Sequence, residues 1–167
     1  MKYRIESEFT GDAATVLKAM FERDIGDRLK PLMRHIQELE TLDWEAKDGV
    51  IRRRVRYRPV PKIESVGPKR IEPRWMEWIE ESTANLTACT VEYRNVPTTP
   101  RVAELLTNSG RMTFDTVSGT RVRRAVACEL HVDVFLLGAI AERIIYSYAK
   151  EIVDEEAMAL GQILAAR

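Results

Sequence analysis

The chain of 167 residues is long enough for a substantial core, because a chain of this size buries roughly 70% of its unfolded surface on folding. Hydrophobic residues make up 45% of it, and 26 basic side chains balance 26 acidic ones. This balance argues against a nucleic-acid partner, which usually binds a basic excess. No run of about 18 apolar residues is present, so nothing in the sequence predicts a membrane-spanning helix.

The N-terminus and the cysteines indicate a cytoplasmic protein. The first residues alternate charged and apolar side chains, which is typical of a strand and unlike a signal peptide. Cys89 and Cys128 lie in apolar, strand-like runs outside any CxxC or Cys/His cluster. We therefore expect free thiols in a reducing compartment, with no metal and no cofactor.

The first third of the chain changes its hydrophobic period from two to about 3.6 and back. Thr10-Gly11-Asp12 supplies a turn and a helix N-cap, Gly26 separates two helical stripes, and Asp48-Gly49 is a hairpin turn. The predicted elements are a strand at 2–9, helices at 12–22 and 27–36, and strands at 38–47 and 50–58.

The remainder predicts a long loop, more antiparallel strands and one long helix. The loop contains four prolines and no sustained period, and long loops in compact domains often serve binding. The final helix would span roughly 45 Å at 1.5 Å per residue. The predicted elements are a loop at 59–74, strands at 75–83 and 87–96, a connection with a helical turn at 101–109, strands at 110–117 and 120–132, and a helix at 134–164.

This order, β-α-α-β-β-β-β-β-β-α, predicts an α+β fold. The strand connections are hairpins or modest loops, so the strands pair antiparallel in a sheet of six to seven strands. The last helix carries an apolar stripe that includes Ile144 and Tyr148, and only the concave face of a curved sheet is large enough to bury it. No repeat or linker divides the sequence, so we expect residues 1–167 to form a single domain.

The element order resembles the START-like superfamily, also called the helix-grip or polyketide cyclase/dehydratase and lipid transport superfamily. Residues 119–164 are similar to an uncharacterised bacterial family within it, mainly in the stretch from Gly119-Thr120 through the Leu136-Leu137-Gly138 turn to Ala141-Glu142. Glu80-Glu81-Ser82 and residues 90–96 are similar to PRELI/MSF1 phospholipid-transfer proteins, although Ala14-Thr15-Val16-Leu17 stands in place of that family's aromatic-rich helix motif. The resemblance implies a START-like domain that binds lipids, sterols, polyketides or other apolar molecules between sheet and helix.

One predicted strand carries an arginine at every second position, so four arginines share one face. Two interpretations stay open: a patch for anionic lipid headgroups or phosphate, and a cross-strand charge ladder on the convex face. The zero net charge favours the ladder. The arginines are Arg52, Arg54, Arg56 and Arg58, and the acidic residues of suitable parity are Asp43, Glu45, Glu77 and Glu81.

The opposite face of that strand points into the concave space. It includes Arg53, and Glu80 has the matching parity on the next strand. A charge there is costly unless it is paired or hydrated. Arg53 and Glu80 are therefore either a polar anchor for a ligand headgroup or a strand-end pair that reaches solvent, unless a bulge reverses the parity.

We expect the ligand-binding residues on the concave wall and on the facing helix, where aromatic side chains also serve as core. His35 and His131 lie far apart without a triad partner and are expected at a helix end or on the surface. No catalytic residue is assigned. The candidate ligand-binding residues are Trp44, Arg53, Val55, Tyr57, Met76, Trp78, Glu80, Val91, Tyr93, Phe114, Val126, Ile144 and Tyr148.

Three functions are consistent with these patterns. The first is non-enzymatic binding or transport of an apolar, lipid- or polyketide-like small molecule, entering near loop 59–74, with at most transient membrane contact. The second is a cyclase or dehydratase that uses Glu80, Arg53 or Tyr93 as an acid/base group. The third is a protein-interaction module of the same fold. Buried ionisable groups in a cavity would favour the enzyme function. A smooth apolar cavity would favour the carrier function, and a filled core would favour the interaction module.

Overall fold

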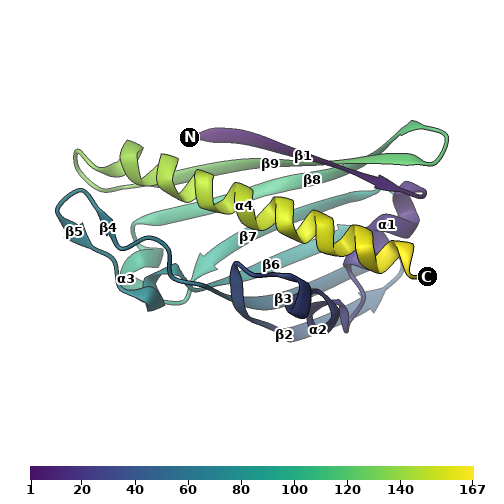
Figure 1. Ribbon diagram of the computed structural model, residues 1–167, viewed down its shortest axis with the longest axis horizontal. Helices are drawn as coiled ribbons and strands as arrows, with labels where there is room; N and C mark the ends of the chain where they lie inside the picture. Colours follow the sequence, from purple (N-terminus) through teal and green to yellow (C-terminus); the bar gives the residue numbers. More distant parts are fainter.

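The computed structural model describes residues 1–167 and shows a seven-stranded antiparallel sheet that curves around one long helix (Figure 1). The strand order is β1-β9-β8-β7-β6-β3-β2, and a separate two-stranded hairpin, β4-β5, stands beside it. The predicted α+β helix-grip fold is therefore confirmed. The strands are β1 Lys2–Thr10, β2 Ile36–Lys47, β3 Val50–Pro59, β4 Ser65–Val66, β5 Lys69–Arg70, β6 Trp78–Asn85, β7 Thr90–Pro97, β8 Leu106–Ser118 and β9 Arg121–Val132, and the helices are α1 Ala13–Met20, α2 Ile25–Leu29, α3 Pro100–Ala103 and α4 Gly138–Ala165, with 3-10 turns η1 Lys30–Leu32 and η2 Pro73–Met76.

Helix α1 begins at a capped end and fills one end of the concave space. The Asp12 carboxylate accepts a hydrogen bond from the Thr15 backbone N–H at 2.9 Å, which satisfies a donor that the first helical turn leaves free. The apolar face of α1 is fully buried and belongs to the same core cluster as Leu160 and Ile163 of α4. The C-terminal half of α4 therefore packs into solid core.

The N-terminal half of α4 is placed differently. Ile144 and Tyr148 are only partly buried, because they face a cavity instead of other side chains. Helix α4 begins at Gly138, four residues later than predicted, after a turn in which Leu136 has a φ of +62°. A Cβ at Gly138 would come within 2.4 Å of the Val132 carbonyl oxygen, so only glycine allows this close approach.

A buried arginine ties α4 to the sheet near the middle of the helix. Arg124 of β9 is fully buried, and its Nη1 lies 2.6 Å from the Glu156 carboxylate. Its Nη2 donates to the Val153 carbonyl oxygen at 3.1 Å. Since a buried charge is stable only when it is paired and hydrogen-bonded, the helix and the sheet hold one another in this register.

The four alternating arginines of β3 lie on the convex face, and three of them, Arg54, Arg56 and Arg58, form a charge ladder. Arg54 pairs with Glu81 at 3.3 Å, and Arg58 pairs with Glu77 at 2.8 Å. The remaining pairs differ from the prediction. Asp43 and Glu45 make no ion pair, Arg52 is exposed and unpaired, and the other two carboxylates come from the start of β2, as Arg56–Glu40 and Arg58–Glu38.

Four further predicted segments differ in detail, and in one of them β8 begins at Leu106, inside the predicted connection 101–109. Residues 59–74 contain the β4-β5 hairpin within the loop. Trp75 and Met76 lie in η2 instead of a strand, because Pro73 starts a helical turn there. The predicted helix 27–36 is shorter, since α2 and η1 end at Leu32 and β2 begins at Ile36.

Replacement of Arg124 by Met should destabilise the protein by about 3–5 kcal/mol, because Glu156 would lose its partner inside the fold. The matched control is R54Q, which breaks an exposed pair and should cost at most about 1 kcal/mol. Urea unfolding measures both. Equal costs for R124M and R54Q would show that Arg124 does not hold the helix.

Candidate functional site

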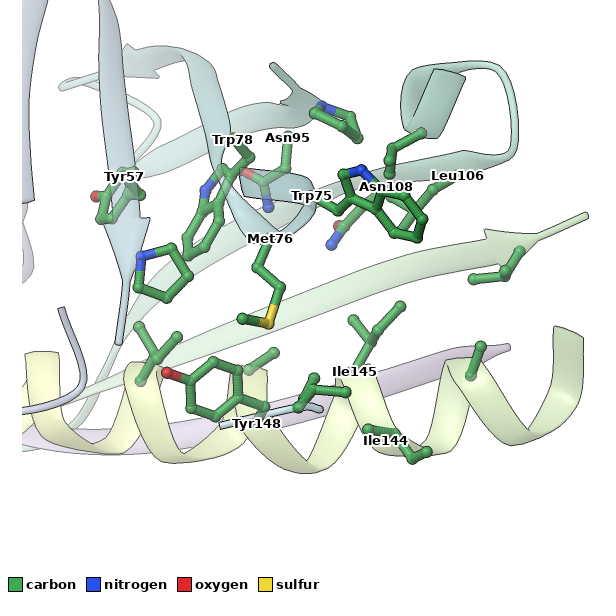
Figure 2. A pocket seen from close by; sticks show the side chains of 18 of the residues that line it. Tyr57, Trp75, Met76, Trp78, Asn95, Leu106, Asn108, Ile144, Ile145 and Tyr148 are labelled. Atoms are coloured by element: carbon green, nitrogen blue, oxygen red, sulfur yellow. The ribbon is translucent and has the colours of Figure 1, made fainter. Parts of the chain in front are cut away.

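A cavity of about 450 Å³ lies between the N-terminal half of α4 and the concave face of the sheet. Its lining comprises 33 residues, 24 of them hydrophobic, and its volume is in the range of small-molecule sites. Segment 59–76, which contains the predicted binding loop 59–74, borders it together with residues from Pro97 to Leu106. Figure 2 shows aromatic side chains of β3 and β6 on one side and Ile144, Ile145 and Tyr148 of α4 on the other.

The structure places eight of the thirteen predicted ligand-binding residues in this lining: Tyr57, Met76, Trp78, Glu80, Tyr93, Val126, Ile144 and Tyr148. The other five lie outside it, where α1 and the C-terminal half of α4 fill the concave space. Four of these five are buried, and Trp44 is partly buried. These five are Trp44, Arg53, Val55, Val91 and Phe114.

The inward parity predicted for Arg53 and Glu80 is correct. Arg53 Nη2 lies 3.2 Å from Glu80 Oε1, and both side chains are buried. Arg53 also donates to the Met20 carbonyl oxygen at 2.8 Å, and its guanidinium stacks 3.9 Å from the centre of the Phe21 ring. Burial is the largest single influence and opposes its charge, but Glu80, Tyr57 and Glu156 together outweigh burial and raise the pKa of Arg53. The hydrogen-bonding groups of Arg53 are thus used by other parts of the protein, whereas Glu80 lines the cavity.

Tyr57 lies beside this pair at the inner end of the cavity. Its ring stacks on Trp78 with centroids 5.0 Å apart and planes 4° from parallel. Burial, followed by the charges of Glu80 and Glu156, raises the pKa of Tyr57 well above its usual value. The phenol is therefore neutral at physiological pH and able to donate a hydrogen bond.

Two polar side chains, Tyr93 and Asn108, line the sheet side of the cavity, and Cys128 lies behind them. Cys128 is buried, and its Sγ–H donates to Asn108 Oδ1 at 3.0 Å. Tyr93 lies across Gly110, where a Cβ would come within 2.7 Å of the Tyr93 hydroxyl, so the glycine makes room for the ring. Burial raises the pKa values of Tyr93 and of the Cys128 thiol.

Several polar or aromatic members of the lining were not predicted from the sequence, among them Trp75, Asn95 and Asn108. The two asparagines were detectable, because Asn95 has the strand parity of Tyr93 and Asn108 that of Phe114. The lack of a strand period around Trp75 left no such signal, since this residue lies in a 3-10 turn.

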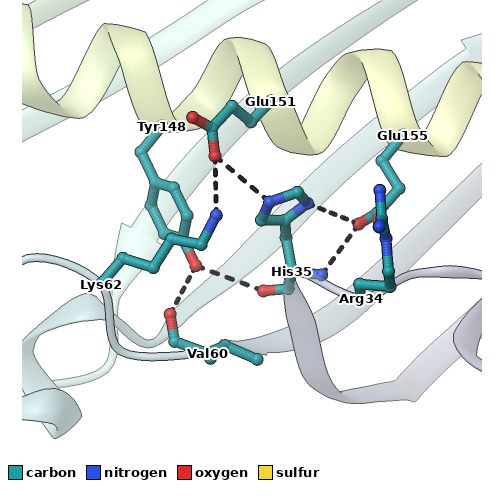
Figure 3. A network of polar contacts seen from close by, with 7 residues as sticks. All are labelled: Arg34, His35, Val60, Lys62, Tyr148, Glu151 and Glu155. Carbon is teal, nitrogen blue, oxygen red and sulfur yellow. Dashed lines mark hydrogen bonds and ion pairs between the residues drawn. The ribbon is translucent and has the colours of Figure 1, made fainter.

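Tyr148 joins the helix side of the cavity to the chain that borders its mouth (Figure 3). Its hydroxyl donates to the Val60 carbonyl oxygen and approaches the His35 carbonyl oxygen at 3.3 Å. Burial, with Glu151 and Glu155 nearby, raises the pKa of Tyr148 to about 12. The start of segment 59–76 is thereby held against α4.

Two glutamates of α4 extend this network. Glu155 Oε2 accepts a hydrogen bond from the His35 backbone N–H and lies 2.9 Å from its ring Nδ1. Glu151 lies 3.2 Å from His35 Nε2 and 3.0 Å from Lys62 Nζ. His35 is therefore half-buried between β2 and α4, a placement that the sequence did not predict, whereas His131 is exposed as expected.

Neither a protein-family model nor a curated protein matches the sequence, but solved structures do. TTHA0849 from Thermus thermophilus is 17% identical with a TM-score of 0.69, and the alignment covers 99% of each chain. The Zhui aromatase/cyclase from Streptomyces sp. R1128 is 13% identical with a TM-score of 0.65, covering 97% of this chain and 92% of that one. Norcoclaurine synthase from Thalictrum flavum is 12% identical with a TM-score of 0.71, covering 100% and 87%.

At these identities the similarity establishes the fold, which is the START-like helix-grip fold that the sequence resembles. The finer similarities, to the bacterial family and to PRELI/MSF1, stay predictions. No helix of the structure is both long and apolar enough to cross a membrane.

The network around Glu155 predicts a pH-dependent stability. Burial would raise the pKa of Glu155, but hydrogen bonds from the His35 and Arg34 backbone and the His35 ring lower it below its usual 4.5. Because the pKa is lower in the folded protein than in the unfolded chain, ionised Glu155 stabilises the fold above pH 4.5, and this stabilisation is lost as the pH falls through the lowered pKa.

At pH of about 7, E155Q should therefore be less stable than wild type by about 1–3 kcal/mol. Chemical unfolding across a pH series should show the difference shrinking below pH 4.5, where the wild-type carboxyl is protonated. The exposed E104Q serves as the control and should match wild type throughout. A difference between E155Q and wild type that is constant with pH would contradict this role.

Proposed function

We propose that the protein binds or transports an apolar small molecule in the cavity between the sheet and α4. The observation that carries this proposal is the cavity itself. It is partly open to solvent, so a ligand can enter it, and its volume of about 450 Å³ lies in the range of small-molecule sites. A wall that is mostly hydrophobic favours an apolar ligand over water alone.

The cavity also argues against a protein-interaction module, for which a filled core is expected. The similar structures support small-molecule binding as well. They include an aromatase/cyclase and a norcoclaurine synthase structure in complex with dopamine and hydroxybenzaldehyde. An apolar or aromatic compound is therefore the ligand class that we propose for this chain.

Transient contact with a membrane is part of the proposal. Phe135 and Leu136 are 88% and 81% exposed on the turn before α4, and the neighbouring Val134 lines the cavity. Exposed apolar side chains beside a cavity would allow an apolar ligand to leave a bilayer without crossing water. Two free cysteines agree with a cytoplasmic location.

An enzyme that acts on the bound ligand is the second candidate. The specific observation in its favour is that Tyr57, Glu80 and Glu156 all line the inner end of the cavity. The neutral Tyr57 phenol would donate a hydrogen bond to the oxygen of a bound carbonyl group, and Glu80 or Glu156 would be the acid/base group. Turnover of an added aromatic ketone that is lost in Y57F, with binding retained, would establish the enzyme.

Filling the cavity should abolish binding. Ala149 lines the cavity on α4, so A149F should occupy ligand volume, whereas A165F adds the same ring at the exposed C-terminal end of the helix. We expect fatty acids, phospholipids or aromatic polyketides to raise the melting temperature of wild type and A165F but not of A149F. Thermal shift and native mass spectrometry measure this. Equal shifts in all three proteins would place binding outside the cavity.

A further inference from the structure

Asn95 of β7 and Asn108 of β8 are directly opposite one another in the sheet, and both line the cavity. Side chains of such a cross-strand pair on one face are separated by about 5 Å at Cβ. In Figure 2 the two amides lie between Trp78 and Trp75, across the cavity from Ile144 and Ile145 of α4. The pair thus forms a polar spot in a wall that is otherwise mostly apolar.

The orientation of each amide is determined by its surroundings. Asn108 Oδ1 accepts from the Cys128 thiol at 3.0 Å, and the reversed amide would replace this bond with an N–H donated to sulfur, a weak acceptor, and would leave the amide oxygen facing an apolar cavity. Asn95 Oδ1 is buried without a partner, and the reversed amide would bury two unpaired donors in place of one acceptor. Both amide nitrogens therefore face the cavity, as Figure 2 shows.

Neither amide nitrogen has a hydrogen-bond partner within the protein, which leaves two neighbouring donors without an acceptor. We infer that Asn95 and Asn108 form a two-donor subsite for an oxygen acceptor on the ligand. This inference rests on the proposed function and specifies the chemistry of its ligand. Two N–H groups that converge from adjacent strands suit one carbonyl oxygen, which has two lone pairs.

An uncharged carbonyl fits this subsite better than a carboxylate or phosphate. The carboxylates of the inner end, Glu80 and Glu156, are each matched by an arginine, so no unpaired cation is buried there. An anion at the asparagines would lose its hydration in an apolar cavity without a counter-charge. The cations in the lining that lack a carboxylate partner, Lys69 and Arg101, are exposed on the bordering loops. The ligand class is therefore a neutral aryl or alkyl ketone, ester or amide.

Two probes that differ only in the acceptor test this assignment: 2-acetylnaphthalene and its hydrocarbon counterpart 2-isopropenylnaphthalene. Calorimetry gives the ratio of their dissociation constants for wild type, N95L, N108L and the double variant. M76L is the matched control, because it changes an apolar side chain of the same lining and removes no donor. Each lost donor should shift the ratio against the ketone by roughly threefold to tenfold, and M76L should leave the ratio unchanged.

The infrared carbonyl stretch of bound 2-acetylnaphthalene provides a second measurement that needs no variant. We expect it at the lower frequency of a hydrogen-bonded ketone in wild type and at the higher, free frequency in N95L/N108L. A free frequency in wild type, or an unchanged ratio in the asparagine variants, would overturn the subsite and leave the apolar carrier intact. If neither probe binds wild type, the carrier proposal fails, and the subsite fails with it.

Discussion

The contact between Arg124 and helix α4 fixes the position of the helix on the sheet, and the core and the cavity both depend on that position. The guanidinium is fully buried, so it must find a counter-charge and acceptors inside the fold, and Glu156 and the Val153 carbonyl oxygen supply them. This requirement pins the helix to β9 near its middle. Towards the C-terminus α4 packs against α1 and the core, and towards the N-terminus it spans the cavity.

The division of the concave space follows from this arrangement. Helices α1 and α2 occupy only one end of the sheet, and a helix about 10 Å wide does not fill the other end (Figure 1). The polar network of His35, Glu151 and Glu155 then holds the chain beside the mouth against α4 (Figure 3). The two halves of α4 therefore have different roles. The buried apolar stripe of its C-terminal half stabilises the core, and the partly buried stripe of its N-terminal half lines the cavity.

The chemistry of the cavity is set by how its polar groups are paired. At the inner end of the cavity each of two arginines is neutralised by its own glutamate. The polar groups that remain for a ligand are neutral: the Tyr57 phenol and the amides of Asn95 and Asn108. The similar structures, at 12–17% identity, include an aromatase/cyclase and a norcoclaurine synthase, so the fold alone does not determine which ligand is bound. The side chains of this lining make that choice.

The sequence alone determined the elements, because hydrophobic period and turn residues act locally. The alternation of β3 was sufficient to place Arg53 inside and Arg54 outside, and the apolar stripe of the last helix was sufficient to assign it to a concave sheet. It also predicted part of the cavity wall, since strand parity assigns Tyr57, Trp78 and Tyr93 to the inner face.

Only the tertiary structure decided which part of that inner face is core and which is cavity. Val55, Val91 and Phe114 have the same parity as the lining residues, but they are buried in a core cluster that also contains residues of α1 and of the C-terminal half of α4. The position of His35 between β2 and α4, and the pairing of Asn95 with Asn108, likewise depend on segments that meet only in the folded chain. Local periodicity specifies the face on which a side chain lies, whereas long-range packing decides what that side chain meets there.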